Sequence, residues 1–301
     1  DLFKWSRYKG EIPLLFDSIN GYILDERKNF KNIFRGIFKW ISGAHTGPCL
    51  SYKNLLKKVY RNCSHVVTTS KIQKQYIEKY AKSTSIINDC FDELSDNPKV
   101  NFTLVSNNKL NLFWEGVPSN LDSLLVLNDL FKIYKFKFTL KINIVTDPKK
   151  AKFSNNLFKT SSYKWLRARL NKAIEIEFFP WSISNLKLAS NYSDLGFIPI
   201  IDNPMYKSKP ANKLWLMRCL GLPVISGENQ DYILASKNLK NKNIFFNLKD
   251  LYELFIYYHS SKNARENLAS ECIDLSKSIS SQDKLIIKWK NAIEKSILIR
   301  N

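Results

Sequence analysis

Three lysines flank the predicted start of one helix. Lys207 and Lys209 precede Pro210, and Lys213 follows it, in a loop directly after the predicted strand 195–200. Proline is tolerated in the first turn of a helix, and a helix N-terminus beside ammonium groups favours a diphosphate. Ligands of doubly wound sheets bind at the carboxyl ends of the strands. The pattern therefore predicts an anion site, with a solvated basic loop as the alternative.

The elements that would position this loop alternate between strands and helices. Apolar segments rich in Ile, Val and Phe lack polar alternation, which is typical of strands buried on both faces of a parallel sheet. We expect strands at residues 12–16, 65–69, 85–88, 110–114, 141–145, 174–178, 195–200, 223–226 and 243–246. We expect helices at residues 52–61, 71–80, 121–134, 163–172, 183–190, 210–219 and 248–260. Ser70 and Ser182 suit N-caps, and Gly221 suits a left-handed C-cap. The alternation predicts an α/β fold with doubly wound sheets.

Five short segments follow one another in a recognisable order. They are 65–70 (HVVTTS), 111–116 (NLFWEG), 194–200 (DLGFIPI), 207–213 (KSKPANK) and 221–226 (GLPVIS). Together they resemble the group 1 family of GT-B glycosyltransferases, most of which retain the anomeric configuration. The resemblance implies two Rossmann-like doubly wound domains facing a cleft, with a nucleotide-sugar donor bound by the second. It also implies an incomplete N-terminal domain, because the family's glycine-rich turn near the N-terminus is not in this chain.

The polar stretch 92–105 contains Pro98 and shows no periodicity, so we interpret it as a linker between two domains. The acceptor-side domain is then residues 1–104, and the donor domain is residues 105–281. Residues 282–301 form a predicted amphipathic helix, which by the resemblance crosses back to the first domain. The opening at Asp1 looks like the middle of a domain, so we expect a further segment to precede it.

The resemblance also assigns donor-binding roles. Trp181 and its neighbours would hold the nucleotide base, largely through backbone hydrogen bonds, although Trp181 is equally well explained as a core residue. Lysines around the helix start would neutralise the diphosphate. Gly227 and Glu228 would touch the phosphates or the sugar, unless they form a plain turn. The donor-binding set comprises Gly116, Trp181, Ser182, Ile183, Lys207, Lys209, Asn212, Lys213, Gly227 and Glu228.

Three residues of the first domain are candidate catalytic residues. Asp17 and Asn20 follow the predicted strand 12–16 and would face the acceptor, where Asp17 could orient a hydroxyl or act as a base. An N-cap or turn role explains either residue as well. His45 lies in a glycine-containing loop, and a loop histidine can also transfer protons.

The sequence departs from the family pattern in two ways. Family members carry a pair of glutamates around the helix 210–219, the first contacting the donor sugar and the second the nucleotide ribose. Ser208 and Leu216 occupy those places here. The loop 116–120 also lacks the basic residues that many members use against the diphosphate, so Lys207, Lys209 and Lys213 would have to supply that charge.

The amino-acid composition indicates which kinds of partner the chain binds and in which compartment it lies. The chain has 301 residues, 44% of them hydrophobic, which is enough for a large core. Lys and Arg number 47 against 27 Asp and Glu, a formal charge of +20, which indicates anionic partners unless it reflects a bias in genome composition.

Five dispersed cysteines and three histidines show no metal-ligand spacing. We therefore expect no metal, no cofactor besides the donor substrate, and a cytoplasmic location.

The segment 30–41 predicts a strongly amphipathic helix. Its apolar residues share one face, and Lys28, Lys31, Arg35 and Lys39 lie off that face. Such a basic and aromatic helix suits an anionic membrane surface. Packing on the core of the first domain explains the same pattern.

These features lead to one expected function and two alternatives. We expect a hexosyltransferase-like enzyme that moves a sugar from a nucleotide donor to a glycan or lipid-linked acceptor in cell-surface polysaccharide synthesis, and the resemblance implies that it retains the anomeric configuration. A catalytically inactive GT-B-like protein that binds a glycan or a partner is the first alternative. A nucleic-acid-binding protein is the second, although no nucleic-acid-binding motif occurs. The sequence leaves the sugar, base, acceptor and linkage open.

Overall fold

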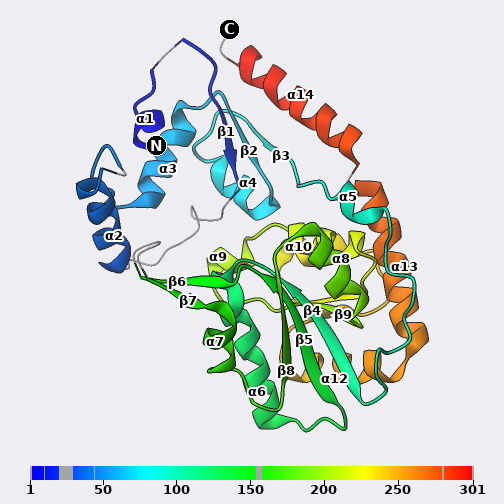
Figure 1. Ribbon diagram of the computed structural model, residues 1–301. Helices are drawn as coiled ribbons and strands as arrows, with labels where there is room; N and C mark the ends of the chain where they lie inside the picture. The colour runs from blue at the N-terminus through cyan, green and yellow to red at the C-terminus, as the bar shows by residue number, and fades with distance from the viewer. Residues whose placement is uncertain are drawn as a thin grey trace.

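The computed structural model describes residues 2–9, 11–19, 30–43, 45–153, 158–279 and 281–299. It contains two separate parallel sheets, which lie in the upper and lower halves of Figure 1. Each sheet is flanked by helices, as expected for strands that are apolar on both faces.

The first sheet has three parallel strands. They are β1 (Leu15–Ser18), β2 (His65–Thr68) and β3 (Thr84–Ile86), hydrogen-bonded in that order. Helices α3 (Tyr52–Asn62) and α4 (Lys71–Ile77) follow one another around β2. Val59 and Tyr60 of α3 join Val66 of β2 and Ile77 of α4 in one buried cluster, which holds this layer together.

The last helix of the chain belongs to the first sheet. Helix α14 (Gln282–Leu298) returns from the second sheet to the first (Figure 1). Its residues Trp289 and Ala292 pack against Val67 of β2 and Ile87. The two ends of the described chain therefore lie in the same half of the molecule.

The second sheet has six parallel strands. Their order is β11 (Ile244–Phe245), β10 (Val224–Gly227), β9 (Leu195–Ile198), β4 (Lys109–Glu115), β5 (Thr139–Thr146) and β8 (Glu175–Pro180). The chain starts at β4, moves outward to β8, and then returns to the other side at β9. This reversal between β4 and β9 is the switch point where doubly wound sheets bind ligands.

Side chains of β4 alternate between two cores. Leu112 and Trp114 enter the cluster covered by α6 (Val126–Ile133) and α12 (Leu248–Ser260). Phe113 enters the cluster covered by α8 (Ile183–Asn191) and α10 (Asn212–Cys219). Both faces are thus buried, which explains why the sequence of this strand shows no polar alternation.

Every expected strand is present within a few residues of its predicted bounds. The cap predictions are confirmed too: Ser70 accepts from Gln73 N at 3.0 Å, Ser182 accepts from Asn185 N at 3.1 Å, and Gly221 has a φ of +77°. A side chain at position 221 would also collide with the backbone of Lys99.

Several predicted boundaries and elements are wrong. Helix α10 begins at Asn212, so Pro210 lies before the N-cap Ala211 and not in the first turn. The linker is partly structured, because Lys99 is buried and donates to Asn191 O at 3.1 Å. The sequence patterns also missed several elements of the structure. The missed elements are α1 (Leu2–Ser6), α5 (Asp92–Ser95), β6 (Lys149–Phe153), β7 (Phe158–Ser161), α9 (Pro204–Lys207), α11 (Gln230–Ser236) and α13 (Lys262–Ile279). Helices α2 (Phe30–Ile41) and α7 (Ser162–Arg167) were expected, and η2 (Pro118–Leu125) overlaps the start of the expected helix 121–134.

Within the described ranges, no helix is both long and apolar enough to cross a membrane. All five cysteines are free thiols, and four of them are buried.

Candidate active site

Lys213 lies at the switch point of the second sheet. Its Nζ donates to Glu115 O at 2.5 Å, is 3.9 Å from Glu115 Oε2, and lies 4.9 Å from the centre of the Trp114 ring. A side chain at Gly116 would collide with this ammonium group and with the Trp114 ring. Position 116 therefore needs glycine for Lys213 to reach the end of β4.

Lys209 reaches the same turn from the other side. Its Nζ lies 3.3 Å from Asn120 Oδ1 and 3.9 Å from the centre of the Tyr206 ring. Burial, and then the charge of Lys213, lower the pKa of Lys209 to about 8. Burial also lowers the pKa of Lys213, against the opposing effect of Glu115. Two ammonium groups thus repel one another beside a glycine turn, an arrangement that an anion would stabilise.

Lys207 does not join this pair. Its Nζ forms an ion pair with Asp202 at 2.9 Å and lies 3.8 Å from Glu228 Oε2. The hydrogen bond to Asp202 is the main cause of its raised pKa. Two of the three lysines singled out in the sequence therefore meet at the switch point, and Lys207 and Glu228 instead pair with each other.

Asn229 holds the lysine loop in place. Its Oδ1 caps α11 by accepting from Asp231 N at 2.8 Å and Tyr232 N at 3.2 Å. Its Nδ2 donates to the carbonyl oxygens of Tyr206 and Lys209, at 3.3 and 3.1 Å. An asparagine just before a helix was the available signal for the cap. Only the fold shows the contacts with the loop.

The residues expected to hold the base lie at the carboxyl end of β8. Trp181 has 52% of its surface exposed, so it is not the core residue that the alternative interpretation required. Ile183 is 38% exposed beside it. Ser182 uses its hydroxyl to cap α8. An exposed aromatic ring at a strand end is available to stack on a base.

Gly227 ends β10 close to the neighbouring strand. A side chain there would approach Ile200 N to 3.0 Å. The glycine thus permits close approach of the two strand ends, which the plain-turn interpretation does not require.

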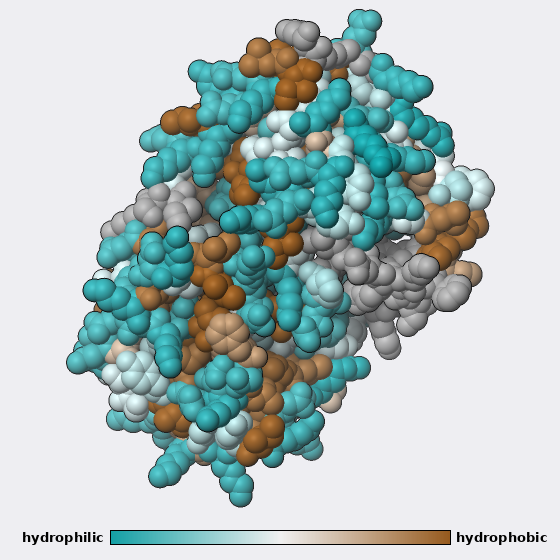
Figure 2. Space-filling view, turned by 180° about the vertical axis from the view of Figure 1, so that it is seen from behind, coloured by the Kyte–Doolittle hydropathy of each residue, from teal (hydrophilic) through white to brown (hydrophobic). Residues whose placement is uncertain are grey.

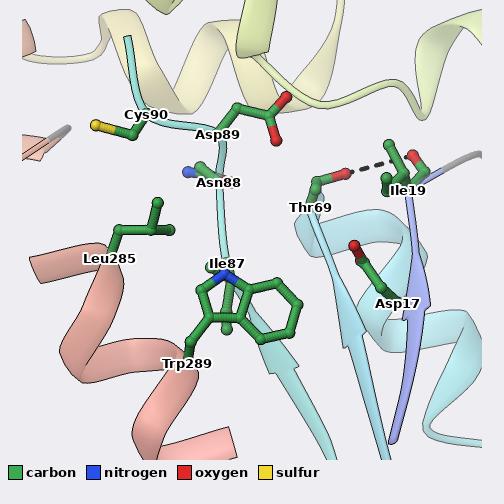
Figure 3. Close-up of a pocket in the computed structure, with 9 residues that line it drawn as sticks. All are labelled: Asp17, Ile19, Thr69, Ile87, Asn88, Asp89, Cys90, Leu285 and Trp289. Atoms are coloured by element: carbon green, nitrogen blue, oxygen red, sulfur yellow. Dashed lines mark hydrogen bonds between the residues drawn. The ribbon is translucent and has the colours of Figure 1, made fainter. Parts of the chain in front are cut away.

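A pocket of about 260 Å³ lies across the cleft, at the carboxyl ends of the first sheet (Figure 3). Asp17 of β1 and Thr69 after β2 line one side, and Asp89 lines another. Trp289 extends toward it from α14. The helix that crosses back from the second sheet thus completes the pocket.

Burial raises the pKa of both carboxyl groups in this pocket. For Asp17 the second cause is the charge of Asp89. For Asp89 a hydrogen bond from Asn212 opposes the rise. Each carboxylate is therefore a better proton acceptor than an ordinary aspartate.

Asn212 connects this pocket to the lysine pair. It is the first residue of α10, next to Lys213, and its Nδ2 donates to Asp89 Oδ2. Its Oδ1 is buried and has no hydrogen-bond partner among the described residues. Asn212 thus connects Asp89 of the pocket to the helix that carries Lys213.

The other two candidate catalytic residues are not in this pocket. Asn20 lies outside the described residues. His45 does not line the pocket; its ring centre lies 5.8 Å from that of Phe3. Burial, and then Lys39, lower the pKa of His45. The structure thus brings Asp17 to the cleft and leaves His45 beside α1 and α2.

The two residues that replace the expected glutamates are buried. Ser208 is 1% exposed, and its carbonyl oxygen accepts from Gln73 Nε2 of α4 at 3.0 Å. Leu216 is 8% exposed and packs in the core of the second sheet. Glu115, with a side chain only 12% exposed, is a carboxylate at the switch point instead. Across the part of the chain that the structure describes, no three His, Cys, Asp or Glu side chains are grouped as a metal site.

Neither a protein-family model nor a curated protein matches the sequence. Solved structures do match the fold. Anabaena HepE, solved with UDP and glucose, is 12% identical, with a TM-score of 0.64 over 94% of this chain and 71% of that chain. Sucrose-phosphate synthase from Thermosynechococcus elongatus is 9% identical, with a TM-score of 0.65 over 97% and 69%.

Staphylococcus aureus TarM, solved with UDP and other ligands, is 11% identical, with a TM-score of 0.58 over 80% of this chain. This chain covers 47% of that one. Likeness at such low identity establishes the fold and not the activity. The chain therefore has the GT-B fold, with two Rossmann-like doubly wound domains that face a cleft.

Proposed function

We propose that this protein is a glycosyltransferase that uses a nucleoside-diphosphate sugar as donor. One observation carries the proposal: at the switch point of the second sheet, Lys213 Nζ lies beside Gly116 and Lys209 Nζ lies at Asn120, near enough for the charge of Lys213 to lower the pKa of Lys209. The solved complexes of HepE with UDP-glucose, and with UDP and glucose, support a nucleotide-sugar donor for this chain as well.

On the donor side, Lys209 and Lys213 bind the diphosphate. Their charges stabilise the negative charge that builds on the leaving oxygen as the bond to the anomeric carbon breaks. Trp181 stacks on the base at the end of β8. The ordered turn around Gly116 brings the backbone close to the phosphates.

On the acceptor side, Asp17 positions the attacking hydroxyl. A bond forms between the acceptor oxygen and the anomeric carbon, and the bond to the diphosphate oxygen breaks. The hydroxyl proton passes to Asp17 or to the departing diphosphate, and the proposal leaves both routes open. Retention of the anomeric configuration and a hexose donor belong to the proposal through the family resemblance alone.

A thermal screen against UDP, GDP, ADP, CDP and TDP tests the donor site. A ligand that binds only the folded state raises the unfolding midpoint. We expect one nucleotide to do so, and the Lys209→Ala, Lys213→Ala double variant to lose the response. Lys249→Ala is the matched control, because Lys249 lies on α12, is exposed, and pairs only weakly with Glu253 at 3.9 Å. If no nucleotide shifts the midpoint, or the double variant responds like the wild type, the proposal is wrong.

A second candidate is a GT-B-like protein that binds a donor or glycan without turnover. The observation that favours it is the replacement of both expected glutamates by the buried Ser208 and Leu216. The two candidates are separated by measuring whether the protein releases nucleoside diphosphate from the nucleotide sugar that it binds most tightly. Release above the level of the double lysine variant supports the enzyme, and binding without release supports the second candidate.

We further propose that the acceptor is carried on an anionic membrane surface, at the cytoplasmic face, in cell-surface polysaccharide synthesis. Helix α2 turns apolar side chains outward: Phe34 is 77% exposed and Ile41 is 73% exposed, with Phe38 and Trp40 about half exposed. Brown, apolar residues gather on this edge of the molecule in Figure 2. This exposure favours the membrane interpretation of the segment over packing on the core.

A basic residue lies on the same helix as this apolar face. It is Lys39, in the last turn of α2. Sedimentation with vesicles containing anionic lipid tests the proposal. A buried Phe contributes roughly 1.5–3 kcal/mol, so Phe34→Ser, Phe38→Ser should weaken binding by about tenfold or more. The control Ile133→Ser changes an exposed apolar residue of the second domain. If the Phe34→Ser, Phe38→Ser variant binds the vesicles as well as the Ile133→Ser control does, the proposal is wrong.

A further inference from the structure

The pocket in Figure 3 differs in charge from the molecule as a whole. The chain carries a formal charge of +20, yet the charged side chains that line this pocket in the described structure are Asp17 and Asp89. No lysine or arginine is among its described lining residues. The basic character of the donor side therefore does not extend across the cleft.

The two carboxylates line one pocket from different segments of the chain. Burial raises the pKa of each, and the charge of Asp89 adds to the rise at Asp17. The hydrogen bond from Asn212 uses one oxygen of Asp89. Ionised carboxylates accept hydrogen bonds but cannot donate them, so the parts of the pocket near Asp17 and near Asp89 suit hydroxyl and ammonium groups.

The opposite side of the pocket is apolar. Trp289 and Leu285 of α14 lie beside Ile87, which is 3% exposed. A sugar ring presents C–H groups on its faces and hydroxyl groups at its edge. An aromatic ring on one side and hydrogen-bond acceptors on the other match both parts.

We propose that this pocket binds an uncharged or amine-bearing sugar unit of the acceptor and rejects units that carry a phosphate or a carboxylate. That the bound unit is an acceptor rests on the proposed function. Asp17 and Asp89 accept hydrogen bonds from its hydroxyl or ammonium groups, and Trp289 stacks on its ring. An anionic unit would face two like charges, and no lysine or arginine among the described lining residues would compensate them.

Saturation-transfer NMR on the full chain tests this selectivity with four probes. They are methyl glucoside, glucosamine, glucuronic acid and glucose 6-phosphate. We expect signals from the first two and at least about fivefold weaker binding of the two anions, since one like charge at close range costs about 1 kcal/mol even in water. Trp289→Ala should abolish the signals, and Trp289→Phe should restore them in part.

Charge removal provides the decisive comparison. In Asp17→Asn, Asp89→Asn the two anions should bind within about twofold of methyl glucoside. Asp96→Asn removes an exposed charge outside the pocket and should leave the selectivity unchanged. The proposal is overturned if the wild type binds anions as well as neutral sugars, if no probe binds, or if the double variant still rejects anions. Failure of the donor site appears separately, as a missing nucleotide shift in the thermal screen.

Discussion

Protonation of Lys209 should control how tightly this protein binds a nucleoside diphosphate. Burial and Lys213 lower the pKa of Lys209 to about 8, so its ammonium group loses the proton in mildly alkaline solution. With that pKa, the protonated fraction falls from about 0.9 at pH 7 to about 0.1 at pH 9. Nucleotide affinity should therefore fall by about tenfold, or about 1.4 kcal/mol, over this range.

The stability of the unliganded protein should change in the opposite direction. Because the pKa is lowered in the folded state, the unfolded chain binds more protons between about pH 8 and the ordinary lysine value of 10.5. The contribution of Lys209 to the free energy of unfolding therefore rises with pH across that window. A loss of affinity between pH 7 and pH 9 thus cannot be attributed to unfolding caused by this group.

Isothermal titration calorimetry at pH 7, 8 and 9, with the nucleotide that the thermal screen identifies, measures the effect. Lys209→Arg is the informative variant, because a guanidinium stays protonated throughout this range. Lys213 also has a lowered pKa, so the variant should keep a smaller decline. Constant affinity of the wild type, or an equally steep decline in Lys209→Arg, would refute this account of the site.

Three further substitutions test single contacts. Gly116→Ala places a side chain against Lys213 and Trp114, and should weaken nucleotide binding by about 1–3 kcal/mol in calorimetry. Trp181→Ala should cost about 1–3 kcal/mol of nucleotide affinity through lost stacking, but less than about 0.5 kcal/mol of stability because the ring is half exposed. Asn229→Ala should lower the free energy of unfolding by about 1–2 kcal/mol in urea titrations, because it removes the cap of α11. Asn229→Asp should keep the cap but weaken nucleotide binding, since it cannot donate to the lysine loop.

Each of these predictions has a result that would contradict it. Normal nucleotide affinity in Gly116→Ala would mean that Lys213 does not need its present position. A large loss of stability in Trp181→Ala would show that Trp181 acts as a core residue and not as an exposed ring available to the base. Normal affinity in Asn229→Asp would show that the bonds to the loop do not position Lys209.

The order of the elements could be predicted from the sequence because the apolar residues of each strand indicate that the strand is buried. Strands β4 and β5 lack polar alternation since helices cover both faces, and that pattern survives in the sequence alone. Caps such as Ser70 and Gly221 are local, because they depend on a few neighbouring residues and one backbone angle. Helix α13 was missed although its buried residues recur every three or four positions, because small or polar types such as Ala264, Arg265 and Ser276 make the apolar stripe weak.

The lysine loop shows where local information ends. The sequence indicated an anion site after β9, but not which of its three lysines face the end of β4. That selection depends on Asp202 and Glu228, which pair with Lys207, and on the absence of a side chain at Gly116.

The sequence by itself determined a doubly wound sheet, a glycine turn and a group of lysines at one strand end. These features could be predicted because burial, caps and turns depend on residues that are close together in the chain. The tertiary structure alone decided that Asp89 and Asp17 line the same pocket and that Trp289 completes it. These side chains come from segments as far apart as β1 and α14. Contacts between such distant segments depend on how the whole chain packs, which no local pattern of residues records.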